Sequence, residues 1–192
     1  ALGFDTSVCS ISTDEIENRD WNSEWKKSYK SVQITENILI KPSWEAMPEN
    51  PPKCLIEIDP AMAFGTGTHE TTKLILQLLE KSLQPKENIL DIGTGTGILA
   101  IAALKLGAEK VLAFDIDPLA TEATIENAEK NNVSNRLNVF TGNLSNVEQS
   151  SFDTIMANVN RTEILKMLPF VTAYMGQKTN LFLSGILTSE RD

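Results

Sequence analysis

Residues 89–97 read Ile-Leu-Asp-Ile-Gly-Thr-Gly-Thr-Gly, so a short apolar run leads directly into three glycines at alternating positions. The apolar run at 88–92 is typical of a buried strand, and residues 98–106, which precede Gly107, are typical of an apolar helix. Glycines between a strand and a helix let the backbone approach a ligand closely, because they have no Cβ and accept positive φ. The stretch therefore predicts a strand, a ligand-binding turn and a helix.

An acidic residue follows a second short strand. Residues 111–114 are apolar and lead into Asp115, about 20 residues beyond the glycines, where a carboxylate can accept hydrogen bonds from both ribose hydroxyls. This arrangement predicts an adenosine-type ligand. The dinucleotide pattern G-x-G-x-x-G would place its third glycine at position 98, which is Ile98 here, so a nicotinamide-dependent oxidoreductase is the less favoured alternative.

Strand-like and helix-like segments alternate through the rest of the sequence. Two later segments, residues 118–131 and 162–174, have helical patterns. Three others, residues 137–140, 154–157 and 180–184, have strand patterns. Such alternation predicts an α/β fold in which helices cover both faces of a doubly wound parallel sheet. Ligands bind at the carboxyl ends of such strands, where Gly93, Asp115 and Asn158 are expected to lie.

The first 59 residues differ in character from the rest. Trp21 and Trp25 are four positions apart on one predicted helical face and are expected to serve packing rather than binding. Residues 32–40 have the apolar, β-branched composition of a strand. We therefore expect residues 1–59 to form a small N-terminal linker segment that adjoins a catalytic domain at residues 60–192.

The composition limits the classes of partner and compartment. The chain of 192 residues has 17 basic and 26 acidic residues and a formal net charge of −9, which disfavours a nucleic-acid backbone as partner. The same charge would attract a basic protein, or it serves only solubility, and composition leaves both interpretations open. Cys9 and Cys54 form no C-x-x-C pattern and His69 is the one histidine, so we expect neither a metal site nor a disulfide framework. The sequence contains no apolar stretch of about 20 residues and no signal-peptide pattern, so we expect a cytoplasmic protein that does not bind a membrane.

A second loop of small residues precedes a predicted helix at 70–81. Residues 64–72 read Phe-Gly-Thr-Gly-Thr-His-Glu-Thr-Thr, without the Gly-Lys-Ser/Thr that a P-loop requires. One interpretation is a helix start, with Thr68 as N-cap and Glu70 in the first turn. The other is a binding site for a ligand carboxylate, because a helix N-terminus offers free amides. Local rules leave both interpretations open.

Several of these segments together resemble one protein family. They are residues 64–72, residues 91–103 (Asp-Ile-Gly-Thr-Gly-Thr-Gly-Ile-Leu-Ala-Ile-Ala-Ala), residues 115–118 (Asp-Ile-Asp-Pro), Ala157-Asn158 and residues 183–187 (Leu-Ser-Gly-Ile-Leu). From about Asp20 onward the sequence resembles the bacterial methyltransferases of large-subunit ribosomal protein eleven, which belong to the class I S-adenosylmethionine-dependent enzymes. The resemblance implies S-adenosylmethionine as cofactor. It also implies transfer of methyl groups to lysine ε-amines and the N-terminal α-amine of that ribosomal protein.

The resemblance further implies a Rossmann-like sheet that is doubly wound. A class I sheet normally has seven strands, and this sequence ends after the fifth predicted strand, so we expect the last two to be missing. Members of the family carry an N-terminal substrate-recognition domain of ferredoxin-like type, of which the residues before Asp20 are expected to be at most a remnant. A cofactor-binding fragment without activity is therefore a second alternative to the enzyme.

Carried over by position, the family's cofactor contacts fall on Thr72, Gly93, Asp115 and Asn158. The resemblance implies Thr72 near the methionine end of the cofactor and Gly93 at a close backbone approach. It implies Asp115 on the ribose and Asn158 beside the transferable methyl group. Asp117, nearer the adenine side, is an alternative to Asp115 as the acid of the site, although as a predicted helix N-cap it already has a structural role. Asn158 is also a candidate for orienting the acceptor amine, and no general base is identified.

The residues after Asn158 bear on the kind of acceptor. Methylases of planar amides and bases carry two prolines and an aromatic residue after the corresponding Asn or Asp, whereas this chain continues with Val159-Asn160-Arg161. An aliphatic amine is therefore the expected acceptor. His69 is expected to have a structural role at the start of its helix.

Overall fold

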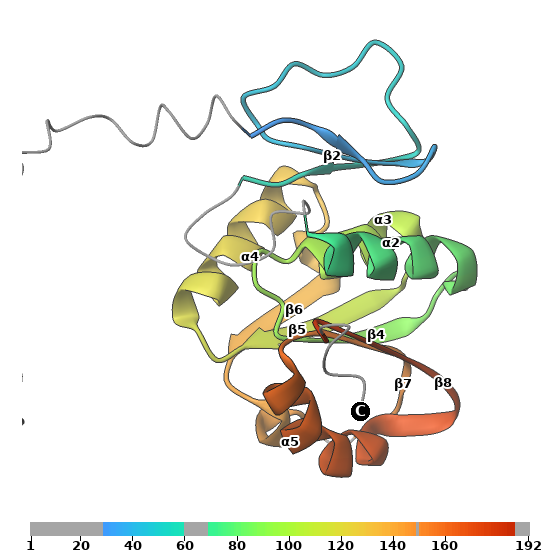
Figure 1. Cartoon of the computed structure of the whole chain (residues 1–192), viewed down its shortest axis with the longest axis vertical. Coiled ribbons are helices and arrows are strands. Elements are labelled where there is room, and N and C mark those ends of the chain that lie inside the picture. The colour runs from blue at the N-terminus through green and yellow to red at the C-terminus, as the bar shows by residue number, and fades with distance from the viewer. Residues whose placement is uncertain (1–28, 60–68, 149, 187–192) are drawn as a thin grey trace, which may run out of the picture.

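The computed structural model describes residues 29–59, 69–148 and 150–186. Within them, five parallel strands form one sheet in the order β6-β5-β4-β7-β8, and three shorter strands form a second sheet (Figure 1). The strands of the large sheet are β4 (Asn88–Ile92), β5 (Lys110–Asp115), β6 (Leu137–Thr141), β7 (Phe152–Asn158) and β8 (Met175–Ser184). All five predicted strands are present, although β8 begins before the predicted residue 180. The predicted α/β fold is confirmed.

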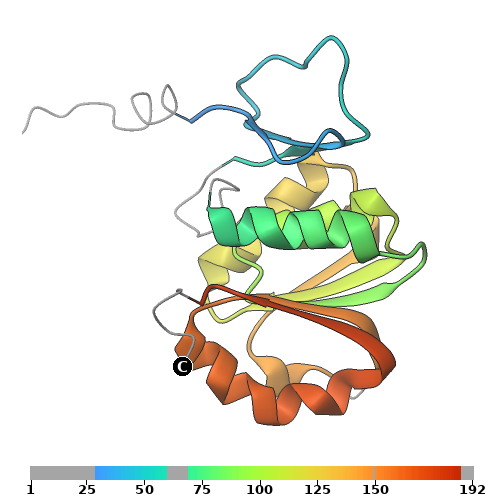
Figure 2. The ribbon, with the colours of Figure 1, turned by 45° about the vertical axis from the view of Figure 1, so that its right-hand side comes forward.

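Helices cover both faces of the large sheet. One face carries three of them, α2 (Glu70–Ser82), α3 (Ile98–Leu106) and α4 (Pro118–Lys130), and the other carries α5 (Arg161–Val171), as Figure 2 shows. The described residues also form the 3-10 turns η2 (Ser134–Arg136), η3 (Leu144–Asn146) and η4 (Thr172–Tyr174). Helix α3 has its predicted bounds. The helix predicted at 162–174 is divided, because α5 ends at Val171 and η4 follows it.

The N-cap of α2 is His69 rather than the predicted Thr68, which lies outside the described residues. His69 has an extended backbone, with φ of −70° and ψ of 137°, and its carbonyl oxygen accepts hydrogen bonds from the amides of Thr72 and Lys73, both at 3.1 Å. The hydroxyl of Thr68 suggested a side-chain cap, whereas the N-cap residue is His69 and its side chain makes no capping hydrogen bond. Trp21, Trp25 and the small-residue loop before Thr68 also lie outside the described residues.

The second sheet consists of β1 (Val32–Gln33), β2 (Ile38–Lys41) and β3 (Cys54–Glu57). Residues 32–40, which predict one strand, form a hairpin in which β1 and β2 are antiparallel, and β3 lies parallel to β2. Thr35 accounts for the break, because its hydroxyl accepts hydrogen bonds from the amides of Asn37 (3.2 Å) and Ile38 (3.1 Å) and so turns the chain.

One apolar cluster joins the small sheet to the helices beneath it. Ile38 and Ile56 of the small sheet are fully buried, in the same cluster as Ile75 of α2 and Ile101 of α3. Every residue of α3 from Ile98 to Leu104 is buried, because this helix lies between the two sheets (Figure 1). The described parts of residues 1–59 and 60–192 thus share one core, and the division between them stays a prediction.

Candidate cofactor-binding site

The glycine turn after β4 has a backbone that only glycine adopts easily. Gly93, Gly95 and Gly97 have φ values of 72°, 59° and 81°. A Cβ on Gly93 would lie 2.4 Å from Cγ1 of Val159, so a larger residue would have to displace that side chain. The Gly93 amide donates to the carbonyl oxygen of Phe114 (3.0 Å), which ties the turn to the end of β5. The turn therefore brings bare backbone to the carboxyl edge of the sheet.

Asp115, the last residue of β5, is fastened to this turn. Its Oδ2 accepts a hydrogen bond from the Gly95 amide (3.0 Å), and its Oδ1 accepts one from the Asp117 amide (3.1 Å). Asp117 has the different role that the sequence suggests, because its carboxylate accepts from the Leu119 amide (2.9 Å) and caps α4. The two acids are thus separated by geometry, and Asp115 is the one that lines the cavity described below.

Asn158 and Thr72 bring two distant segments together. The side-chain amide of Asn158, at the end of β7, donates to the hydroxyl of Thr72 (3.1 Å) in the first turn of α2. Thr72 is fully buried, and Asn158 is partly buried. The hydroxyl of Ser184, at the end of β8, donates to the carbonyl oxygen of Thr71 (3.4 Å). The start of α2 is therefore tied to the ends of β7 and β8.

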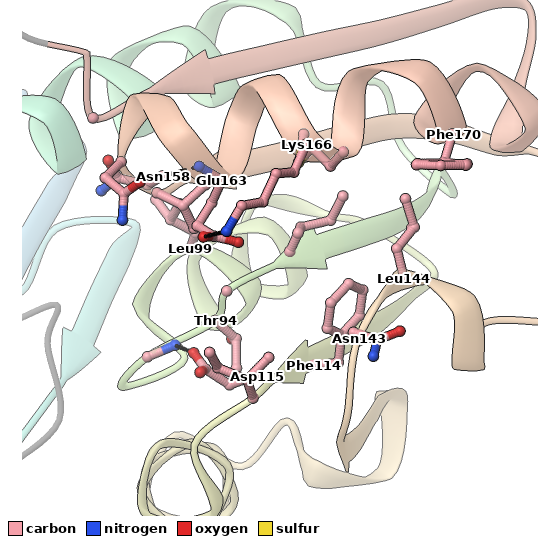
Figure 3. A pocket seen from close by; sticks show the side chains of 18 of the residues that line it. Thr94, Leu99, Phe114, Asp115, Asn143, Leu144, Asn158, Glu163, Lys166 and Phe170 are labelled. Carbon is pink, nitrogen blue, oxygen red and sulfur yellow. Dashed lines mark hydrogen bonds and ion pairs between the residues drawn. The ribbon is translucent and has the colours of Figure 1, made fainter.

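A cavity of about 1150 Å³ lies where these segments meet, and its lining includes Thr72, Gly93, Asp115 and Asn158. Figure 3 shows Asp115 and Asn158 on different parts of its wall. The cavity is at the carboxyl ends of β4, β5 and β7, the edge at which open parallel sheets bind ligands. His69 also lines it. All four residues carried over from the family thus meet at one cavity.

Several lining residues were not singled out from the sequence. Phe114 and Ile116 flank Asp115, and Asn143 and Leu144 follow β6, so together they form a mostly apolar wall beside that acid (Figure 3). The sequence could have indicated Asn143 as a lining residue, because it comes two positions after the last residue of a parallel strand. Leu144 carried no such signal, since an apolar residue after a strand is as often part of the core.

Helix α5 supplies the facing wall of the cavity. Glu163, Lys166 and Phe170 line it, and Lys166 Nζ pairs with Glu163 Oε1 at 2.7 Å (Figure 3). Both side chains remain about half exposed or more, so this pair contributes little to stability. Asn160 caps the helix, because its side chain accepts from the Glu163 amide (3.0 Å). The cap fixes where α5 begins relative to Asn158.

Asp91 is fully buried beneath the glycine turn. Its Oδ2 accepts a hydrogen bond from the Thr94 hydroxyl (2.8 Å), while its Oδ1 has no hydrogen-bond partner among the described residues. Burial raises the pKa of Asp91 to about 7; the Thr94 hydrogen bond acts against this rise and the charge of Asp115 adds to it. The carboxyl group is therefore only partly ionised near neutral pH.

Metal-assisted chemistry has no visible centre in the part of the chain that the structure describes. No group of three or more His, Cys, Asp or Glu side chains is arranged there to hold a metal ion. The helices within the same residues are all too short or too polar to cross a membrane.

Three features test whether the cavity suits an S-adenosyl cofactor. Gly93 lines the cavity and has no side chain, so a ligand can lie against its backbone. Each oxygen of Asp115 accepts one hydrogen bond from the backbone and has a further lone pair, which suits a ribose diol. The apolar wall of Phe114, Ile116 and Leu144 suits a flat base. The residues present fit this cofactor.

Comparisons with known proteins agree on one family. The family model described as ribosomal protein L11 methyltransferase (PrmA) matches residues 2–192. A ribosomal protein L11 methyltransferase of Alkaliphilus metalliredigens (strain QYMF) is 42% identical over 96% of this chain and 58% of its own length. The corresponding protein of Desulfitobacterium hafniense (strain DSM 10664 / DCB-2) is 44% identical over 96% of this chain and 59% of its own length.

A solved structure gives the same result. The crystal structure of ribosomal protein L11 methylase from Lactobacillus delbrueckii subsp. bulgaricus superposes with a TM-score of 0.76 and 33% identity, covering 82% of this chain and 81% of that one. The chain spans 58–62% of the length of the curated relatives that it matches. Because the family model extends over nearly all of its residues, the chain belongs to the ribosomal protein L11 methyltransferase family.

Proposed function

We propose that this chain binds S-adenosylmethionine and transfers methyl groups to lysine ε-amines and the N-terminal α-amine of ribosomal protein L11. The observation that carries the proposal is the convergence of four residues on one cavity in a member of this family: Thr72, Gly93, Asp115 and Asn158. In this proposal residues 60–192 form the methyltransferase domain and residues 1–59 the linker segment.

Each of the four residues has a proposed task. Asp115 accepts hydrogen bonds from the ribose hydroxyls, and Gly93 lets the ligand lie against the backbone. Thr72 and Asn158, which are hydrogen-bonded to each other, hold the methionine end of the cofactor. When bound, the cofactor would supply a sulfonium methyl group to an uncharged amine, with the neutral thioether as the leaving group. Positioning is the main contribution that such a site makes to the rate.

The acceptor amine is proposed to bind beside Asn158. The side-chain amide nitrogen of Asn158 donates to Thr72, so its carbonyl oxygen is the group that we assign to the acceptor. An amine has N–H donors for this oxygen, and the bond would aim the nitrogen lone pair away from it. Full turnover by Asn158→Ala, with wild-type cofactor affinity, would remove this role.

Charge supports a basic protein as partner. The formal net charge of −9 attracts a lysine-rich substrate and repels the phosphate backbone of a nucleic acid. We propose that the chain acts in the cytoplasm, where ribosomal proteins are made, and that it does so without direct binding to nucleic acid.

Calorimetric titration with S-adenosylmethionine tests the cofactor site. We expect saturable binding by the chain, and a Kd raised about tenfold or more by Asp115→Ala, because buried ligand hydroxyls would lose their acceptor. Asp117→Ala is the matched control, since it removes an N-cap two residues away and should lower the melting temperature with little change in Kd. Equal effects of both variants on Kd would contradict the assignment of Asp115.

Two further assays on the same protein distinguish the remaining candidate functions. Methyl incorporation into purified ribosomal protein L11 supports the enzyme, whereas cofactor binding without incorporation supports a binding module. Binding of NAD in place of S-adenosylmethionine would support an oxidoreductase and overturn the proposal.

A further inference from the structure

Helix α4 and its C-cap Asn131 carry four buried polar side chains; Thr121 bonds to Pro118 and Thr141, and the other three reach two further places. Thr124, Asn127 and Asn131 are 0%, 2% and 5% exposed. Burying hydroxyl and amide groups is costly unless each of them finds a hydrogen-bond partner. These three find their partners in two places, the glycine turn after β4 and the end of β3, which makes this helix a connection between two parts of the molecule.

Asn127 alone of the three contacts both places. Its Nδ2 donates to the carbonyl oxygen of Thr96 in the glycine turn (3.0 Å), and its Oδ1 accepts from the amide of Asp59 just after β3 (3.3 Å). The orientation of the side chain is determined by its partners, because a carbonyl oxygen can only accept and a backbone N–H can only donate.

The neighbouring side chains each contact one of the two places. The Thr124 hydroxyl donates to the carbonyl oxygen of Gly95 (3.0 Å), in the turn. Asn131 accepts from the Glu57 amide (2.9 Å) and donates to the Glu57 carbonyl oxygen (2.6 Å), at β3. The helix thus offers a residue for the turn only, a residue for β3 only, and Asn127 for both.

We propose that Asn127 is a positioning residue that holds the glycine turn in its cofactor-binding conformation and couples it to the segment after β3. Within the turn the Thr94 hydroxyl bonds to Asp91 and the Thr94 carbonyl oxygen accepts from the Gly97 amide, whereas the carbonyl oxygens of Gly95 and Thr96 accept from side chains of α4. The Gly95 amide is fastened by Asp115, and the Thr96 carbonyl is fastened by Asn127. This inference rests on the proposed function, because Asn127 holds the glycine turn that the proposed cofactor site contains.

The coupling follows from what holds Asp59. Its carboxylate pairs with Lys130 of α4 (2.7 Å) and accepts from the Ser43 amide (2.7 Å), and its own amide donates to Asn127. A shift of Asp59 would therefore displace the side-chain amide of Asn127, which also bonds to Thr96 in the turn. By reciprocity, a ligand that fixes the turn also steadies Asp59.

Two variants separate positioning from general stability. Asn127→Asp keeps an acceptor for the Asp59 amide but replaces the donor to Thr96 with a carboxylate oxygen. Asn131→Ala removes the bonds at Glu57 and the bond to the main-chain carbonyl oxygen of Asn127 (2.8 Å), but it keeps the side-chain bond from Asn127 to the turn. We expect Asn127→Asp to raise the Kd for S-adenosylmethionine about tenfold or more, and Asn131→Ala to lower the melting temperature while Kd stays within about twofold of wild type. Equal Kd values for wild type and Asn127→Asp would overturn the proposal.

Amide hydrogen exchange without cofactor provides the second readout. We expect residues 93–97 to exchange faster in Asn127→Asp than in Asn131→Ala, and Asn127→Ala serves if the carboxylate prevents folding. If the wild-type chain fails to bind S-adenosylmethionine, the proposed function fails, and exchange alone then decides the inference. Unchanged exchange at 93–97 in the Asn127 variants would show that the turn holds itself.

Discussion

Asp91 and Asp115 are close together across the glycine turn, yet their surroundings differ. Asp115 accepts two backbone hydrogen bonds and lines the cavity, whereas Asp91 is fully buried and its Oδ1 has no hydrogen-bond partner among the described residues. Burial favours the neutral form of a carboxyl group, and the charge of Asp115 acts in the same direction. Because Asp91 is partly protonated, the site does not carry a second full negative charge beneath the turn in addition to that of Asp115.

We predict that Asp91→Asn changes the dependence of stability on pH. The pKa of this carboxyl is about 3.9 in an unfolded chain and about 7 in the folded protein, so the folded state binds more protons between these values. The stability that the protonated group contributes is full below about pH 4 and is lost as the pH rises to about 7. Relative to wild type, the variant should gain free energy of unfolding across this window, on the order of a few kcal/mol.

Urea unfolding at several pH values between about 4 and about 8 measures this difference. Thr94→Val is a useful companion, because it removes the hydrogen bond that lowers the pKa of Asp91 in the folded protein and should therefore raise the upper end of the window. A constant difference between wild type and Asp91→Asn over the whole range would contradict the prediction.

At the scale of single residues, the sequence indicated those at strand ends best. Asp115 and Asn158 were located because each ends an apolar run, and the structure has them as the last residues of β5 and β7. Thr72 came from the family resemblance alone, since its partner Asn158 is 86 positions away and no local pattern joins them. The isolation of Asp91 depends on how neighbouring elements cover it, which periodicity does not describe.

Strands β2 and β3 are joined by an ion pair that is largely buried. Lys41 and Glu57 lie opposite each other in the parallel register, with Nζ 2.8 Å from Oε2. The Lys41 side chain is 3% exposed and that of Glu57 is 26% exposed. The lysine therefore depends on the glutamate, whereas the glutamate can still reach water.

We predict an asymmetry when either partner is removed. Glu57→Ala leaves a buried ammonium without its counterion and should lower the free energy of unfolding by about 3–5 kcal/mol. Lys41→Met fills the same space with an apolar chain and leaves a hydrated carboxylate, so its cost should be clearly smaller. Chemical denaturation of both variants measures the difference, and equal losses would mean that water reaches Lys41 freely.

At the scale of elements, regular periodicity was predictable and side-chain turns were not. Helix α3 has its predicted bounds because an apolar run is closed by Gly107, which adopts a φ of 119° that favours glycine. The β1–β2 hairpin was mistaken for one strand because Thr35 is itself a good strand former, and only its hydrogen bonds show that it turns the chain.

The whole molecule is built around α3, which lies between the two sheets (Figure 1). An apolar helix with no polar face needs cover on all sides, and the small sheet supplies the cover that the large sheet cannot. The sequence showed the apolar character of this helix but not what would cover it. We therefore expect the two sheets to unfold together.

Substitution in the small sheet tests this cooperativity. Ile56→Ala should lower the free energy of unfolding of the whole chain by about 2–5 kcal/mol, because Ile56 is fully buried against α3. Leu74 of α2 is 56% exposed, so Leu74→Ala is the control and should change the free energy of unfolding by about 0.5 kcal/mol or less. Amide exchange of β2 and β4 followed in urea should give one common transition, and two separate transitions would contradict a shared core.

The order of the strands along the chain also determines when each part of the cavity is made. β4, at the centre of the sheet, is followed along the chain by β5 and β6, and its other neighbour, β7, comes later. The glycine turn and Asp115 therefore leave the translating ribosome well before Asn158 does. Chains begin to fold from the N-terminal side during synthesis. A nascent chain thus releases the wall that faces a nucleoside before the strand that carries Asn158 can join β4.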